Sequence, residues 1–125
     1  MRPKSETLTG QELEIMKVIW LRDQATVREV YEELKTRRTI AYTSVQTMMN
    51  ILEAKGHLKK EPGEKAQTYI PARPQQTVVR SMVREFVDRV FDGSARPLLV
   101  HLLKEKGLTA AERKELQKLL DKEAE

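Results

Sequence analysis

Pro62-Gly63 lies between two short extended segments, and these come directly after three stretches with helical periodicity. A Pro-Gly pair strongly favours a turn, so residues 57–61 and 67–70 are predicted to pair as a β-hairpin with Leu58 and Tyr69 facing inward. This order of helix, helix, helix and hairpin limits the first part of the chain to a mainly α domain with a small β-hairpin.

Local chemistry predicts where several helices begin and end. A Thr-x-x-Glu capping box, in which a hydroxyl and a carboxylate satisfy free backbone amides, opens three of them. The boxes are Thr9–Glu12, Thr26–Glu29 and Thr109–Glu112. The first helix is predicted to reach about Leu21, and the third to start near residues 41–44 and stop at Gly56. Residues 25–27 also suit a brief strand contact.

From Gln75 onward the pattern is wholly helical. The first helix of this region is predicted to run to Gly93. Ser94 is then predicted to cap a leucine-rich helix with Pro97 in its first turn, and a last helix follows.

Three helices followed by a hairpin are typical of a winged helix-turn-helix, in which one helix enters the major groove of DNA and another braces it. The groove-reading helix needs short hydrogen-bonding side chains that reach base edges. The third predicted helix carries five candidates: Thr43, Ser44, Gln46, Thr47 and Asn50. Nearby cations are candidates for phosphate contacts. They are Arg37, Arg38, Lys55, Lys59, Lys60 and Lys65.

The charge distribution supports this hypothesis locally rather than globally. The chain has 23 Lys and Arg against 19 Asp and Glu, a net charge of +4 that does not by itself indicate a nucleic-acid partner. Residues 35–60 alone carry +5, with six cations and one glutamate. An ordinary solvated surface is the alternative interpretation of that patch.

Several classes of protein are excluded or disfavoured by composition. The chain has no cysteine and only two histidines, which argues against a disulfide framework, a thiol nucleophile and a metal site, and no cofactor is expected. Asp88 and Asp92 share a helix face but lack a visible acid partner, so we do not predict an enzyme. No apolar run approaches the roughly 20 residues of a membrane span, and the start lacks a signal-peptide core, so we expect a cytoplasmic protein without membrane insertion.

The C-terminal region is predicted to hold two copies of the chain together. Residues 98–103 are apolar on nearly every side, and a region of about 50 residues is too small to bury them alone. Packing against the chain's own first domain is the alternative. We predict a winged-helix DNA-binding domain over 1–74 and a three-helix dimerisation domain over 75–125. The candidate dimer residues are Phe86, Val90, Leu98, Leu99, Leu102, Leu103, Leu116, Leu119 and Leu120.

Ordered anchors along nearly the whole chain resemble those of the penicillinase-repressor (BlaI/MecI-type) transcriptional regulators. They are Leu8-Thr9-x-x-Glu12-x-x-Ile15-Met16-x-x-Ile19-Trp20, residues 25–30, residues 42–49, Leu52-Glu53-x-Lys55-Gly56-His57-Leu58, Tyr69-x-Pro71, residues 91–94 and Leu108-Thr109-x-x-Glu112. The resemblance implies a homodimeric repressor that binds double-stranded DNA at a palindromic operator covering a promoter. Known members control genes for β-lactamase or a penicillin-binding protein.

The resemblance also implies a membrane sensor-protease as inducer, which leads to cleavage of the repressor in its dimerisation part. The family bond is typically Asn-Phe, and His101-Leu102 stands at the matching position, so this chain departs from the pattern. Copper-responsive relatives have a cysteine-rich C-terminus, which this chain lacks. A protein-interaction adaptor and a small-ligand-responsive regulator, each built on a winged helix, are the alternative functions.

Overall fold

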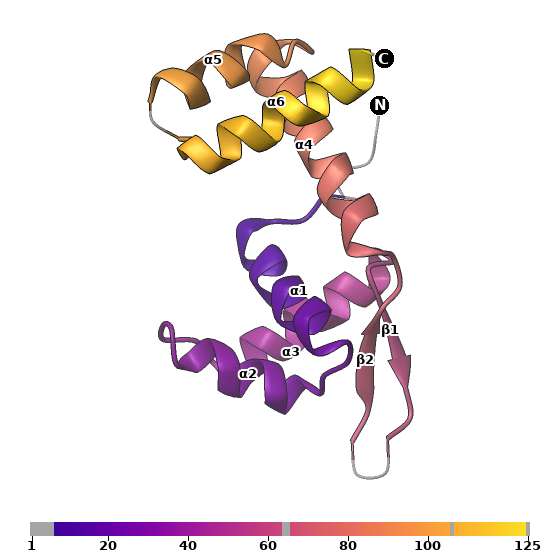
Figure 1. The fold of residues 1–125 in the computed structure, drawn as a ribbon. Coiled ribbons are helices and arrows are strands. Elements are labelled where there is room, and N and C mark those ends of the chain that lie inside the picture. Colours follow the sequence, from indigo (N-terminus) through magenta and orange to yellow (C-terminus); the bar gives the residue numbers. More distant parts are fainter. Residues whose placement is uncertain (1–6, 64–65, 106, 125) are drawn as a thin grey trace. The chain divides into compact units, whose positions relative to one another are not determined.

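A computed structural model describes residues 7–63, 66–105 and 107–124 of the chain. These residues form the predicted order of three helices, a hairpin and three further helices (Figure 1). The elements are α1 (Gly10–Arg22), α2 (Val27–Lys35), α3 (Tyr42–Ala54), β1 (Leu58–Glu61), β2 (Thr68–Pro71), α4 (Gln75–Phe91), α5 (Arg96–Lys104) and α6 (Ala110–Ala124). The predicted class, mainly α with one small hairpin, is confirmed.

All three predicted capping boxes are present at their helix starts. At α1, the Glu12 amide donates to the Thr9 hydroxyl over 3.1 Å, and the Thr9 amide donates to the Glu12 carboxylate over 2.9 Å. The same reciprocal pairs open α2 at Thr26 and α6 at Thr109. Each box satisfies two amides that a helix start otherwise leaves unpaired.

The predicted cap at Ser94 is wrong. The N-cap of α5 is Ala95, which offers no side-chain hydrogen bond, although Pro97 lies in the first turn as predicted. Asp92 and Gly93 both have positive φ and turn the chain sharply after α4. The Ser94 amide donates to the Phe91 carbonyl, so Ser94 belongs to the turn that ends α4, and α5 begins one residue too late for Ser94 to stand at its N-cap position.

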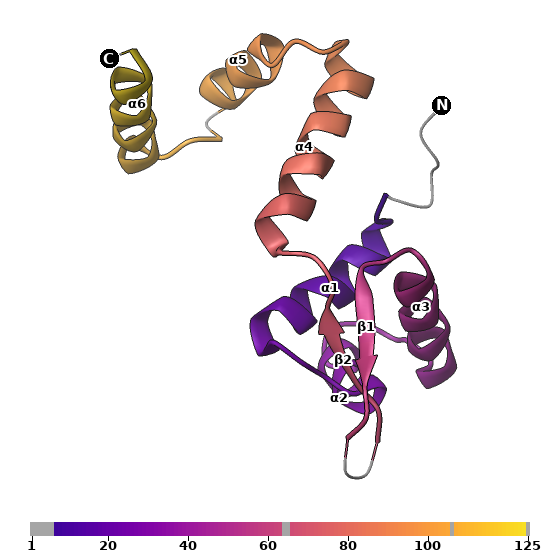
Figure 2. The same ribbon diagram turned by 90° about the vertical axis from the view of Figure 1, so that its right-hand side faces the viewer.

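The hydrophobic core lies between the first three helices and one face of the hairpin (Figure 2). Trp20 and Met48 pack against its edge. Full burial of each large apolar side chain contributes about 1.5–3 kcal/mol, so this cluster holds α3 firmly by one face. The core residues are Leu8, Ile15, Met16, Val18, Ile19, Ala25, Val30, Leu34, Val45, Met49, Leu52, Leu58, Tyr69 and Val78.

The hairpin is joined to the helices by a short third strand contact. β1 and β2 pair antiparallel, and Lys60 lies opposite Tyr69. Ala25 forms a bridge to Tyr69, with backbone N–H to O distances of 3.0 and 2.8 Å. Leu58 and Tyr69 are buried, so the inward-facing residues of the hairpin and the brief strand contact before α2 are both confirmed.

The chain divides into two compact units at Met82 and Val83. The first half of α4 belongs to the N-terminal unit, because Val78 lies in its core and Met82 packs against that core. In the C-terminal unit, Val87 is the only buried apolar residue among those that the structure describes. None of the described helices is long and apolar enough to cross a membrane.

Candidate nucleic-acid interface

One face of α3 is anchored in the core and the opposite face is open. Val45, Met49 and Leu52 are buried at the spacing of one helix face. The predicted base-reading residues lie outside this stripe, and all five are exposed: Thr43, Ser44, Gln46, Thr47 and Asn50. The packing therefore presents a polar, uncharged surface on a helix that the core holds in place.

The start of α3 is held by aromatic packing instead of a cap. Its N-cap, Ala41, makes no side-chain hydrogen bond. Tyr42 meets Tyr31 of α2 edge-to-face, with ring centroids 5.5 Å apart. The guanidinium of Arg28 lies 5.1 Å from the centroid of Tyr42 and 5.9 Å from that of Tyr31. The sequence patterns did not single out Arg28, because its contact with α3 depends on tertiary packing.

The other end of the polar face is tied to the hairpin. The Tyr69 hydroxyl donates to the Asn50 side-chain oxygen over 3.2 Å. Lys60 lies over the Tyr69 ring, 5.9 Å from its centroid, and pairs with Glu53 of α3 at 3.4 Å. Asn50 is therefore both an exposed polar residue and a link between α3 and the hairpin.

The predicted phosphate-contacting cations fall into different environments. Arg37 and Lys59 are exposed, and Arg37 makes only a long 3.7 Å ion pair with Glu33. Arg38 is half-buried against Glu14 of α1, with a 3.0 Å ion pair. Lys65 lies outside the described residues. Among the described members of the predicted set, Arg37, Lys59 and Lys60 thus keep the most accessible positive charge.

Lys55 is the least accessible of the predicted phosphate contacts that the structure describes. Its side chain is 14% exposed, and its ammonium donates to Glu12 over 2.7 Å and to the Thr7 carbonyl over 2.9 Å. Burial by itself would raise the pKa of Glu12, but the hydrogen bonds from Lys55 and the Thr9 amide outweigh it. The pKa therefore lies below its ordinary value. Lys55 joins α1, α3 and the segment before α1.

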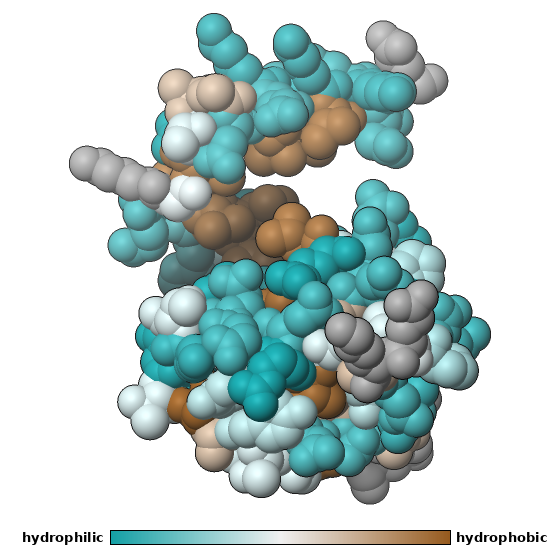
Figure 3. All heavy atoms as spheres, turned by 90° about the horizontal axis from the view of Figure 1, so that it is seen from below, coloured by the Kyte–Doolittle hydropathy of each residue, from teal (hydrophilic) through white to brown (hydrophobic). Residues whose placement is uncertain are grey.

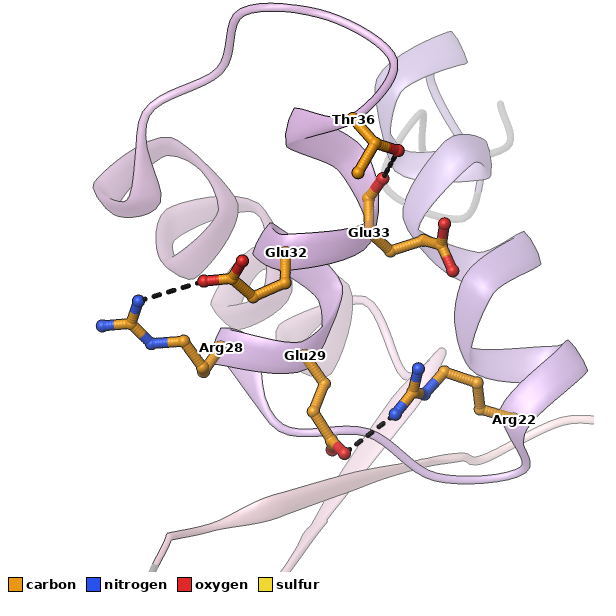
Figure 4. A pocket seen from close by; sticks show the side chains of 6 residues that line it. All are labelled: Arg22, Arg28, Glu29, Glu32, Glu33 and Thr36. Atoms are coloured by element: carbon orange, nitrogen blue, oxygen red, sulfur yellow. Dashed lines mark hydrogen bonds and ion pairs between the residues drawn. The ribbon is translucent and has the colours of Figure 1, made fainter.

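A pocket beside α2 is lined mainly by charged residues, and two of its glutamates form ion pairs with two of its arginines. It is lined by Arg22, Arg28, Glu29, Glu32, Glu33 and Thr36. Glu29 lies 2.8 Å from Arg22, and Figure 4 shows Glu29 directed at Arg22 and Glu32 directed at Arg28. The Thr26 amide and Arg22 lower the pKa of Glu29, and Lys35 lowers that of Glu32. No group of three or more potential metal ligands occurs among the described residues.

The C-terminal unit leaves apolar side chains at its surface (Figure 3). Of the predicted dimer residues, Leu98, Leu102 and Leu116 are half-buried and the other six are exposed. Val83 and Val100 are exposed as well and were absent from the predicted set. The pair matched to the family cleavage site lies within α5, where the His101 ring is exposed and 6.2 Å from that of Phe91.

Comparison with known proteins decides the family. The family model of the penicillinase repressor matches residues 8–122. The chain belongs to the penicillinase repressor family. It is 27% identical over 118 residues to the penicillinase repressor of Bacillus licheniformis, covering 94% of this chain and 92% of that protein. It is 30% identical over 111 residues to the transcriptional regulator BlaI of Mycobacterium tuberculosis, covering 87% of this chain and 80% of that protein.

Solved structures of relatives match the N-terminal part of the fold. The solution structure of the DNA-binding domain of the repressor BlaI is 31% identical, with a TM-score of 0.52, and covers 59% of this chain and 90% of that one. The structure of monomeric Bacillus licheniformis BlaI in complex with the blaP half-operator is also 31% identical, with a TM-score of 0.51. The match covers 56% of this chain and 85% of that one. The predicted winged helix-turn-helix is thereby confirmed. So is the family resemblance, and the family is one of transcriptional repressors, not of enzymes.

Proposed function

We propose that this chain is a sequence-specific DNA-binding repressor that acts as a homodimer on a palindromic operator. The observation that carries the proposal is the exposed, uncharged polar face of α3, held from behind by Val45, Met49 and Leu52. A similar fold in BlaI binds the blaP half-operator. The protein would act in the cytoplasm, and repression would be steric, through exclusion of polymerase from the promoter.

The base-reading set is assigned by chemistry and exposure. Gln46 and Asn50 can pair bidentately with adenine, and Thr43 and Thr47 can offer a hydroxyl and contact the thymine methyl. Ser44 adds a short hydroxyl on the same exposed face. These contacts supply sequence discrimination.

The phosphate set is assigned by access to solvent. Arg37, Lys59 and Lys60 form this set, and we leave Arg38 out because its guanidinium is half-buried and pairs with Glu14 at 3.0 Å. We leave Lys55 out, because its ammonium is already enclosed by Glu12 and Thr7. Phosphate contacts add affinity and salt dependence without sequence information.

The dimer is proposed from the composition of the surface of the C-terminal unit. Phe86 and Val90 of α4, Leu99 and Leu103 of α5, and Leu119 of α6 each expose two-fifths or more of their surface. A unit with so little core of its own would be stabilised by burying these side chains against a second copy, and two-fold dimers are the commonest arrangement. A dimer would also double the number of bases read.

Binding is tested by enrichment of duplexes from a randomised library, followed by titration of the enriched duplex and a shuffled one. Affinity should fall with salt on both, and the enriched duplex should bind about 10³-fold or more tightly than the shuffled one. Gln46→Ala should cost about 1–3 kcal/mol on the enriched duplex and little on the shuffled one. Lys59→Gln is the matched control and should weaken both equally. Failure to enrich any duplex would refute the proposal.

Assembly is tested separately by sedimentation at micromolar concentration. Leu99→Asp should convert the dimer to monomer, because a carboxylate would be buried without a partner. Lys104→Asp places the same group on an exposed position of the same helix and should leave the dimer intact. A monomeric wild-type protein would overturn the homodimer proposal without affecting the DNA-binding test.

A further inference from the structure

Arg28 joins the first turn of the recognition helix to the helix that braces it. Its guanidinium packs on the rings of both Tyr42 in α3 and Tyr31 in α2. The two rings also contact each other edge-to-face at 5.5 Å. These three side chains form a tyrosine–arginine cluster that spans the turn between α2 and α3.

The cluster is held together from the side of α2 by a shared carboxylate. Glu32 lies 3.4 Å from the Arg28 guanidinium and 2.9 Å from the Lys35 ammonium. Lys35 in turn lies 5.3 Å from the Tyr31 centroid. The charge of Arg28 is therefore partnered by Glu32, and its guanidinium also lies within cation–π distance of both tyrosine rings.

The start of α3 depends on such a contact more than the starts of α1 and α2 do. Thr9 and Thr26 cap α1 and α2 with reciprocal hydrogen bonds, whereas Ala41 supplies none to α3. Tyr42 is the first residue of α3 and directly precedes Thr43 and Ser44. The packing of Tyr42 therefore determines how the first base-reading side chains are presented.

We propose that Arg28 is a positioning residue for sequence recognition. It fixes the first turn of α3 through cation–π contacts with Tyr42 and Tyr31, and it acts on DNA selectivity through that helix and not through a phosphate. This inference rests on the proposed DNA-binding function. It predicts that the guanidinium is required, because this broad group can contact both rings and Glu32 at once, whereas the compact ammonium of lysine carries the charge but cannot reach all three partners.

The first test measures affinity for the enriched and the shuffled duplex at several salt concentrations. Arg28→Ala and Arg28→Lys should each lower the ratio of the two affinities about 3- to 10-fold, the range expected when exposed cation–π contacts are lost. The slope of log affinity against log salt should stay unchanged. Arg37→Ala is the control for a phosphate contact, and it should leave the ratio unchanged while lowering the slope by about 0.9.

Two outcomes of this test would overturn the proposal. A lower salt slope in Arg28→Ala, restored by Arg28→Lys, would make Arg28 a phosphate contact. Unchanged affinities for both duplexes would show that the cluster has no influence on recognition.

The second test does not depend on DNA. Amide hydrogen exchange in the free protein should become about 3- to 10-fold faster for residues 45–47 in both Arg28 variants, and amides of α1 should keep their rates. If the wild-type protein bound no duplex selectively, the proposed function would fail while this measurement still decided whether Arg28 holds the helix. Unchanged exchange at residues 45–47 would refute the positioning role.

Discussion

Replacing Lys55 with Met tests whether this lysine stabilises the fold or binds DNA. The substitution keeps most of the apolar stem but removes the ammonium that contacts Glu12 at 2.7 Å and the Thr7 carbonyl at 2.9 Å. The Glu12 side chain is 5% exposed, so the change leaves a buried carboxylate without its cation.

The expected loss of unfolding free energy at pH 7 is about 3 kcal/mol. Breaking a buried ion pair typically costs about 3–5 kcal/mol, and Glu12 retains the hydrogen bond from the Thr9 amide, which favours the lower end. A substitution that only removed an exposed cation would cost well under about 1 kcal/mol.

The stability lost in Lys55→Met should depend on pH, and the pKa of Glu12 determines the direction of that dependence. The pKa of Glu12 lies below its ordinary value in the folded protein, so its stabilisation is present above the unfolded pKa and is lost as the pH falls through the folded one. Without Lys55, burial dominates and raises that pKa, and the carboxyl group can become protonated at mildly acidic pH. The difference in unfolding free energy between wild type and Lys55→Met should therefore become smaller as the pH falls from 7 towards about 4.

Urea unfolding followed by Trp20 fluorescence measures both effects, because Trp20 is the single tryptophan and packs against the core. Glu12→Gln and the double variant complete a mutant cycle, in which the two substitutions should be strongly non-additive. The salt slope of DNA binding should stay unchanged in Lys55→Met. A stability loss that is small, or equal at pH 7 and pH 4, would refute this reasoning.

Three further substitutions test single contacts by the same unfolding assay. Tyr69→Phe removes the hydroxyl that holds Asn50 and should cost about 1 kcal/mol and lower selectivity for the enriched duplex, and an unchanged stability would mean the bond contributes nothing. Thr26→Ala removes a capping box and should cost about 1 kcal/mol, whereas Thr26→Ser should be nearly neutral. Gly56→Ala should cost about 1–2 kcal/mol, because Gly56 has φ +86° and the added Cβ would lie 3.2 Å from an Arg73 nitrogen, and a neutral result would argue against that geometry.

The sequence alone determined the elements of the fold and much of their order. Capping boxes act within four residues, helical periodicity repeats along one element, and a Pro-Gly turn acts on its own neighbours, so each can be read locally. The exposed polar face of α3 was predictable for the same reason, since the buried Val45, Met49 and Leu52 fall on one side of a helix. Ser94 was misassigned because the turn after α4 extends one residue further than predicted, which places Ala95 at the N-cap of α5.

Only the tertiary structure decided which cations of the basic segment are paired and which are left in solvent. Along the sequence Lys55, Arg38 and Lys59 are equivalent cations of one basic segment. Packing pairs Lys55 with Glu12 and Arg38 with Glu14, residues far away in the chain, and leaves Lys59 in solvent. A side chain's environment depends on which elements meet around it, and this meeting is set by the burial of the whole core and not by the residue's neighbours in sequence.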